Sequence, residues 1–255
     1  MPVDLTIPLG TLIGFLLVLA RVGGAFVFVP LPGMTAGPEP ARVALSLGFT
    51  LALLPLWPVV TVTDLGIGQL AVWLLSEASF GMTVGLSVAL LIETLLLATQ
   101  AFGVQAGYSY AATIDPSTNA DSNVLVVLAQ LTAGLLMFSL GLDRQILRGF
   151  AHSLIVYPPG TFVLKLSTAE TVLHLGSSMF STGLRLAMPV IVLLMLVEIA
   201  LALMGRMHQQ LQLLALSFPV KMLATLAFLA IIIGFFLPVF RSAADHTLSS
   251  IFGAL

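Results

Sequence analysis

Residues 77–93 read EASFGMTVGLSVALLIE, a run of small and apolar residues with a glutamate at each end. Neither carboxylate has an obvious basic partner nearby in the sequence. A charge at hydrocarbon depth is costly, so such a residue usually faces a protein interior or a wet cavity. The stretch therefore predicts a helix of a membrane-type protein whose carboxylates need partners from elsewhere.

The composition of the whole chain points the same way. Of the 255 residues, 59% are hydrophobic and 8% are charged, and the mean hydropathy is +1.13. Soluble proteins carry about 45–50% apolar and about 25% charged residues. The net charge of −2 favours neither nucleic acid nor an anionic surface as a partner. Without cysteine, the chain has no disulfide, thiol nucleophile or thiolate metal site.

Long apolar stretches alternate with polar islands along the chain. A spanning helix needs roughly 20 residues, and most of the stretches qualify: 5–29, 43–62, 70–99, 124–142, 184–204 and 213–239. The weaker pieces 146–156 and 172–180 are too short to span and predict interfacial or re-entrant segments. Prolines inside the long stretches favour kinks because they remove a helical N–H; they are Pro55, Pro58, Pro189 and Pro219. We expect an all-α, integral-membrane-type fold of kinked helices and helical hairpins in one domain, residues 1–255.

The two glutamates belong to a row at i, i+4 spacing, namely Glu77, Gly81, Gly85, Ala89 and Glu93. Such a row slants around a helix, so its three small residues form a groove. In a straight helix the carboxylates lie about 24 Å apart and on nearly opposite faces, so they cannot form one pair. Two interpretations stay open. The helix either makes polar contacts with neighbouring chains or lines a lumen, or it is a span with an interfacial glutamate at each end.

The segment 102–110, FGVQAGYSY, mixes small, aromatic and amide residues before the turn signal Asp115-Pro116. It carries no charge before Asp115. This favours a loop buried in a pore or between subunits over an ordinary extramembrane loop, which is the alternative.

The polar run 206–212, RMHQQLQ, predicts the turn of a helical hairpin between two very apolar arms. Lys221 lies within the second arm, where a cation needs a partner or a route to the interface. Glu198, on the first arm, is the candidate partner.

Enzyme signatures are absent from the sequence. It has no HExxH, no GxSxG, no P-loop and no dinucleotide-binding glycine pattern, and its four histidines are dispersed. We therefore expect no catalytic residue, metal or cofactor.

An ordered set of landmarks across nearly the whole chain resembles the FliR/SctT family of type III secretion export-gate proteins, in its flagellar branch. In order, they are Arg21 and Pro30, PEPARVAL at 38–45, Glu77 with Gly81 and Gly85, QAG at 105–107, IDP at 114–116, Ser153, PPG at 158–160, LAMP at 186–189, Arg206, Gln210, and FPVK at 218–221. The chain departs from the family in the hairpin turn, where Gln209-Gln210 and Gln212 replace a usual Pro-Gln and Asn. It departs again at Gly141-Leu142-Asp143, where the family often has Gly-Gly-His.

The resemblance implies a structural, channel-forming subunit of a flagellar protein-export gate, in the bacterial inner membrane at the flagellar basal body. The implied partners are FliP-type and FliQ-type subunits in a helical hetero-oligomer, an FlhB-type switch protein, an FlhA-type export component and unfolded export substrates. A FliP-like part would cover about 1–182 and a FliQ-like hairpin about 183–255. The region 102–123 would be a plug loop that closes the channel at rest.

Two sets of site residues follow from the resemblance. The plug or pore loop would include Phe102, Gly103, Gln105, Gly107, Tyr108, Tyr110, Asp115 and Pro116. Contacts with other subunits would use Glu77, Gly81, Gly85, Glu93, Glu198, Arg206, Gln210 and Lys221. The main alternative is a stand-alone secondary transporter that uses Glu77, Glu93 and Glu198 as proton or ion sites on broken helices.

Overall fold

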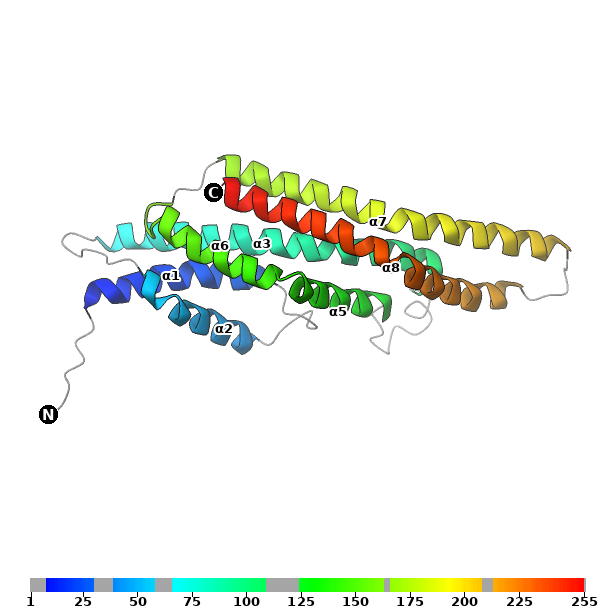
Figure 1. Cartoon of the computed structure of the whole chain (residues 1–255), viewed down its shortest axis with the longest axis horizontal. Helices are drawn as coiled ribbons and strands as arrows, with labels where there is room; N and C mark the ends of the chain where they lie inside the picture. Colours follow the sequence, from blue (N-terminus) through cyan, green and yellow to red (C-terminus); the bar gives the residue numbers. More distant parts are fainter. Residues whose placement is uncertain are drawn as a thin grey trace. The chain divides into compact units, whose positions relative to one another are not determined.

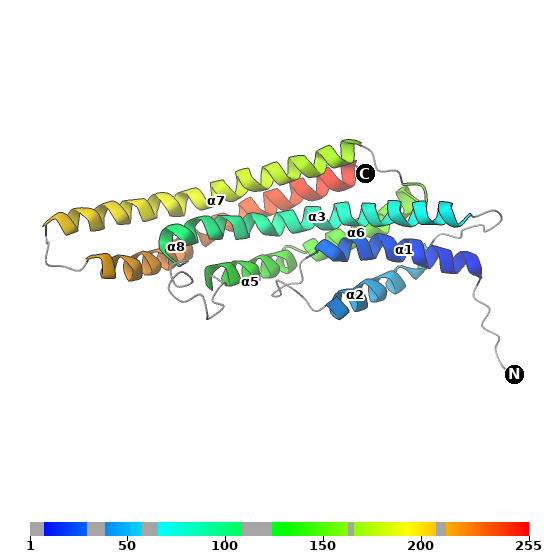
Figure 2. The ribbon, with the colours of Figure 1, turned by 180° about the vertical axis from the view of Figure 1, so that it is seen from behind.

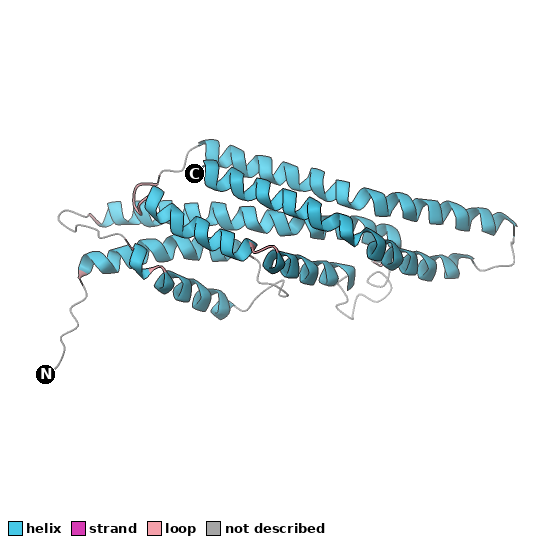
Figure 3. Ribbon diagram, viewed as in Figure 1, coloured by secondary structure: helices cyan, strands magenta, loops and turns pink. Residues whose placement is uncertain are grey.

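The computed structural model describes residues 8–29, 39–57, 66–108, 124–162, 166–207 and 213–254. Every regular element in these ranges is a helix (Figure 1 and Figure 3). The elements are α1 (Leu9–Phe28), α2 (Glu39–Ala52), the short 3-10 helix η1 (Leu54–Leu56), α3 (Ile67–Ala106), α5 (Val124–Ser139), α6 (Leu142–Val156), α7 (Leu166–Met207) and α8 (Leu213–Ala254). The predicted all-α fold is confirmed.

Several of these helices are of the membrane-spanning type. Within the described residues, three are long and apolar enough to cross a membrane: α1, α3 and the part of α7 from Thr168 to Arg206. Two further pairs of segments pass the same test only when joined across a short break: α5 with α6, and Ser217–Ile231 with Gly234–Ile251 of α8. Gly141 separates α5 from α6 in a left-handed conformation, φ 66°, which glycine adopts readily. The integral-membrane character predicted from hydropathy is confirmed.

Some polar islands lie inside helices rather than between them. The piece 172–180, expected to be interfacial or re-entrant, is part of the 42-residue helix α7, so it is not a separate re-entrant segment. Likewise α8 continues through Arg241 and His246 to Ala254. There Arg241 and His246 are exposed while Phe240 and Ala244 are buried. A helix tolerates polar residues on one face, so polarity alone does not end it.

The long helices continue through their prolines, although α8 bends by 64° between Ile231 and Gly234. Pro189 lies inside α7, and Pro219 and Pro238 lie inside α8. Pro55 lies in η1, and Pro58 is outside the described residues.

The chain divides into two compact units. The first comprises Met1–Leu90, Gly141–Gly176 and His246–Leu255, and the second comprises Leu91–Leu140 and Ser177–Asp245. Helices α3, α7 and α8 therefore contribute residues to both.

Each unit has its own apolar core. In the first, α1 and α2 pack side by side (Figure 2), and the buried side chains of Val18, Val22, Leu53 and Leu154 form a cluster. The second buries apolar residues of α3 and α7 completely or nearly so: Phe102, Leu186, Ala187, Val190 and Leu194.

Candidate functional site

Helices α1 and α3 cross in the first unit with their backbones in direct contact (Figure 2). A Cβ atom at Gly81 would collide with the carbonyl oxygen of Arg21, and one at Gly85 with that of Ala25. On α1, a Cβ atom at Gly24 would collide with the backbone of α3. Small residues on facing helices allow such an approach. The predicted groove exists, and α1 of the same chain occupies it.

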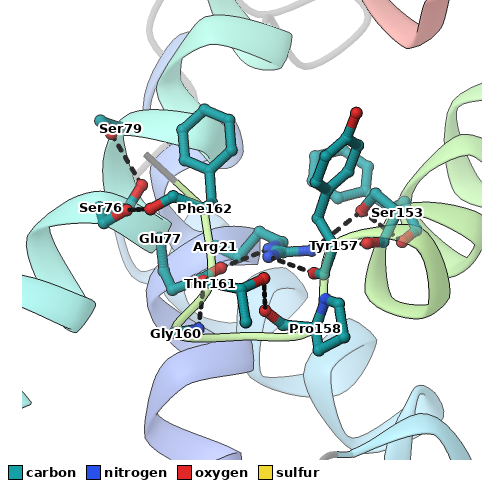
Figure 4. A network of polar contacts seen from close by, with 11 residues as sticks. Arg21, Ser76, Glu77, Ser79, Ser153, Tyr157, Pro158, Gly160, Thr161 and Phe162 are labelled. Atoms are coloured by element: carbon teal, nitrogen blue, oxygen red, sulfur yellow. Dashed lines mark hydrogen bonds and ion pairs between the residues drawn. The ribbon is translucent and has the colours of Figure 1, made fainter. Parts of the chain in front are cut away.

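Arg21 and Glu77 form a buried ion pair at this crossing (Figure 4). Nε of Arg21 donates to Oε2 of Glu77 at 2.5 Å, and both side chains are 0% exposed. The guanidinium carbon also lies 4.5 Å from the ring centroid of Phe80, within the range of a cation–π contact. A buried ion pair is stable only when its remaining donors and acceptors are also bonded. Neighbouring backbone groups meet that requirement here.

The other donors of Arg21 bind the end of α6. Nη1 donates to the carbonyl oxygen of Ser153 at 3.1 Å and to its Oγ at 3.2 Å, and Nη2 donates to the carbonyl oxygen of Tyr157 at 3.0 Å. The last carbonyls of a helix have no N–H partner in the next turn, and the negative end of the helix dipole attracts a cation. Arg21 therefore caps α6 from a different helix.

Glu77 holds the connector that follows α6. Its Oε1 accepts the backbone N–H of Gly160 at 2.8 Å, and the hydroxyl of the adjacent Ser76 donates to the carbonyl of Phe162 (Figure 4). Gly160 has φ 90°, and a Cβ atom there would press on the ring of Trp73. Glycine is required at this position on both grounds. Four of the sequence landmarks thus meet in one network.

The expectation that Glu77 has no partner in its own chain was wrong. Arg21 lies 56 positions away in the sequence. At that separation the number of intervening residues does not tell whether two side chains meet. A signal was nevertheless available, because Arg21 is a cation inside the first apolar stretch and such a cation needs an acid. Glu77, Gly81 and Gly85 all contact α1, so they are not free surface for another subunit.

A second polar cluster lies in the second unit, where α7 and α8 flank the C-terminal end of α3. Glu198 uses both of its carboxylate oxygens: Oε1 lies 3.1 Å from Nζ of Lys221, and Oε2 accepts Nε2–H of Gln105 at 3.0 Å. The side chain of Lys221 is 14% exposed and that of Glu198 is 52% exposed. The predicted pairing of Lys221 with Glu198 is confirmed.

Helix α3 ends in a turn that depends on Gly107, which has φ 87°. The N–H of Gly107 donates to the carbonyl of Val104, and the N–H of Tyr108 donates to that of Gly103, each at 3.1 Å. This pattern of two bonds is a Schellman motif, in which a left-handed glycine ends the helix.

The same turn contacts α8. A Cβ atom at Gly107 would lie 2.8 Å from the ring of Phe218, and the phenol of Tyr108 donates to the carbonyl of Met222 at 3.1 Å. Burial raises the pKa of Tyr108 above its ordinary value, so the phenol remains a hydrogen-bond donor at neutral pH.

The predicted plug loop is partly helical. Phe102, Gly103 and Gln105 belong to α3, and Phe102 is fully buried. The helix continues past Phe102 because small and apolar residues do not stop it, and it ends only at Gly107. The remaining predicted plug residues, Tyr110, Asp115 and Pro116, lie outside the described residues.

The other predicted contact residues are more accessible. Glu93 on α3 and Arg206 at the end of α7 are exposed, while Gln210 is outside the described residues. Of the three acids named in the transporter alternative, Glu77 and Glu198 are ion-paired within the chain. In the part of the chain that the structure describes, no group of three or more His, Cys, Asp or Glu side chains could hold a metal ion.

Comparison with known proteins assigns the family. The sequence profile of the bacterial export proteins, family 1, matches residues 12–247. The chain belongs to this family. The flagellar biosynthetic protein FliR of Escherichia coli (strain K12) is 25% identical over 238 residues, which cover 93% of this chain and 89% of the relative. The proteins of the same name from Pectobacterium carotovorum subsp. carotovorum and Bacillus subtilis (strain 168) are 28% identical over 217 residues (84% and 81% covered) and 25% identical over 240 residues (92% of each). The resemblance predicted from the landmarks is confirmed.

Proposed function

We propose that this chain is a non-catalytic, channel-forming subunit of a flagellar type III protein-export gate in the bacterial inner membrane. The observation that carries the proposal is the family match over residues 12–247, together with flagellar relatives that align over most of their own length. The role is structural because the described polar residues hold helices and connectors together and form no catalytic group.

Exposed apolar surface on α7 supports assembly with other subunits. In the most apolar window of this helix only 22% of the residues are buried. Five of its exposed apolar side chains recur at spacings of three and four, so these five lie on one face: Met188, Val192, Met195, Ile199 and Leu203. Such a face requires lipid or another apolar surface to cover it.

We assign this face to FliP-type and FliQ-type subunits. Glu93, Glu198, Arg206 and Lys221 would supply the polar contacts at its margin. The assembled gate would receive unfolded export substrates from the FlhA-type component and would contact the FlhB-type switch protein.

Co-purification in mild detergent, followed by mass measurement of the intact complex, tests the assignment. We expect two different small hydrophobic proteins in unequal stoichiometry. The substitution Val192→Lys should remove them because a charge would be buried against an apolar partner. Met204→Lys, at a position of the same helix that is 48% exposed but lies on another face, should not. Purification of the chain as a solute-binding monomer or homo-oligomer would contradict the proposal.

We further propose that the loop after Gly107 closes the channel at rest. The base of this loop is well defined, since Gln105, Gly107 and Tyr108 contact Glu198, Phe218 and Met222 respectively. These contacts would hold one end of the proposed plug at a fixed place.

Deletion of residues 109–116 tests this role. It keeps the turn that ends α3 and removes three of the predicted plug residues, Tyr110, Asp115 and Pro116. Membranes that contain the assembled complex should become leaky to small solutes, whereas Glu170→Gln, at an exposed position of α7 outside the loop, should leave them tight. Unchanged permeability in a complex of normal mass would refute the plug.

A further inference from the structure

A cavity of about 370 Å³ lies inside the second unit, between α3, α5 and α8. Its volume falls within the range of about 300–1,000 Å³ that is typical of ligand sites. Helix α5 lines it with a single face, whose members follow one another at helical spacing: Leu125, Leu128, Ala129, Thr132 and Leu136. None of the lining residues that the structure describes is charged.

The two hydroxyl groups in the wall are already engaged. Oγ1 of Thr99 donates to the carbonyl of Leu95 at 2.9 Å, and Oγ1 of Thr132 donates to the carbonyl of Leu128 at 2.7 Å. Each bond lies within its own helix, so neither hydroxyl needs an external partner. A bound water usually makes two to four hydrogen bonds, and a polar ligand also needs partners. The cavity therefore suits an apolar occupant.

Small residues keep the space open. Ala129 on α5 and Gly234 on α8 both line the cavity. A Cβ atom added at Gly234 would meet nothing within 4 Å. A large side chain at either position would fill the space, as well-packed protein interiors normally require.

The dimensions of the cavity fit a thin occupant better than a protein helix. Along α5, the lining runs from Leu125 to Leu136, about 16 Å at 1.5 Å per residue. A volume of about 370 Å³ over that length leaves a width on the order of 5–8 Å, whereas a helix with side chains is about 10–12 Å across. A single extended hydrocarbon chain fits this space. Leu128 and Leu237, 49% and 43% exposed, lie where the cavity opens to the outside.

We propose that this cavity binds one acyl chain of a membrane phospholipid. Its walls belong to segments that are long and apolar enough to span a membrane, alone or as joined pairs. Where these segments lie in a membrane, the opening would meet the hydrocarbon layer, in which acyl chains are the abundant apolar ligand. The site does not depend on the proposed channel function, and it would persist if that function were wrong.

Photolabelling with a phospholipid that carries a diazirine near the end of one acyl chain tests the site. The full chain, with whatever subunits accompany it, is reconstituted in vesicles of phosphatidylethanolamine and phosphatidylglycerol that contain the probe. Labelled positions are then mapped by mass spectrometry. We expect labels on the α5 face that lines the cavity and on α3 at Thr99 and Phe102, which lipid outside the cavity does not reach.

Filling the cavity should abolish this labelling. Ala129→Phe and Gly234→Leu each place a large side chain in the space, and we expect about a tenfold loss of label at Thr99 and Phe102 because a filled site excludes its ligand. The matched control is Leu135→Phe, at a position of α5 that is 71% exposed and not part of the cavity wall.

Retained labelling at Thr99 and Phe102 in either filled variant that folds would overturn the proposal. So would labelling by a free fatty acid with the same diazirine but not by the phospholipid. Thermal unfolding of each variant in detergent identifies any that fails to fold, and two variants in different helices keep the test decisive.

Discussion

The two ion pairs found among the described residues differ mainly in their exposure to solvent. Arg21–Glu77 in the first unit is 0% exposed on both sides, whereas Lys221–Glu198 in the second is 14% and 52% exposed. The buried pair has protein partners for its remaining donors and acceptors, while the exposed pair can exchange its partners with water or another chain. An acid in an apolar helix can therefore stabilise the fold of its own chain or remain available for contacts with another subunit. Burial distinguishes the two roles.

The largest effect is expected for Arg21→Leu. It leaves the Glu77 carboxylate buried without a cation, and breaking a buried ion pair on one side costs about 3–5 kcal/mol. The free energy of unfolding, measured in mixtures of mild detergent and sodium dodecyl sulfate, should fall by that amount. Arg185→Leu, at an exposed arginine of α7, is the control and should have little effect.

The double variant Arg21→Leu/Glu77→Leu separates charge from packing. It removes both charges, so it should be more stable than Arg21→Leu alone. A double variant less stable than the single one would show that the network of hydrogen bonds, rather than the unpaired charge, dominates.

Glu77→Gln should have the next largest effect. The amide has one acceptor oxygen, whereas the carboxylate accepts from both Arg21 and Gly160, so one donor loses its partner. Loss of a hydrogen bond to a charged group costs about 1.5–3 kcal/mol. Hydrogen exchange at the Gly160 amide should accelerate, while Glu170→Gln, at an exposed position, should leave it unchanged. Unaltered exchange at Gly160 would show that Glu77 does not hold the connector after α6.

Gly81→Ala tests the crossing that brings the buried pair together. Its Cβ would collide with the backbone of Arg21, and overpacking costs about 1–3 kcal/mol. Gly23→Ala on α1 meets nothing within 4 Å and should stabilise the helix by up to about 1 kcal/mol. Opposite signs in the same unfolding measurement are expected. Equal effects would show that the helices do not approach closely at Gly81.

The smallest effect is expected for Lys221→Met. Ion pairs with this much solvent access contribute about 0–1 kcal/mol, so the unfolding free energy should change by less than about 1 kcal/mol. The long apolar stem of methionine preserves most of the packing. A loss as large as that of Arg21→Leu would mean that exposure is not the variable that separates the two pairs.

The pairing that sequence reasoning found and the one it missed differ in how they are connected. Glu198 and Lys221 lie on successive apolar arms joined by a polar turn, and a hairpin brings its arms together, so their contact was predictable. Arg21 and Glu77 are separated by α2 and η1, and their meeting depends on how α1 crosses α3. The predicted loop began at Phe102, whereas α3 continues to Ala106. The helix ends at Gly107 because this glycine has a positive φ, and hydropathy does not predict backbone angles.

By itself, the sequence determined the helical, membrane-type class, the glycine groove on α3 and the family, because hydropathy, i, i+4 spacing and ordered landmarks are properties of the linear chain. Only the tertiary structure decided that α1 fills the groove, that Arg21 caps α6 and pairs with Glu77, and that an apolar cavity remains beside α5. Each of these depends on contacts between segments distant in sequence. Their free energy arises only when the helices pack and exclude water.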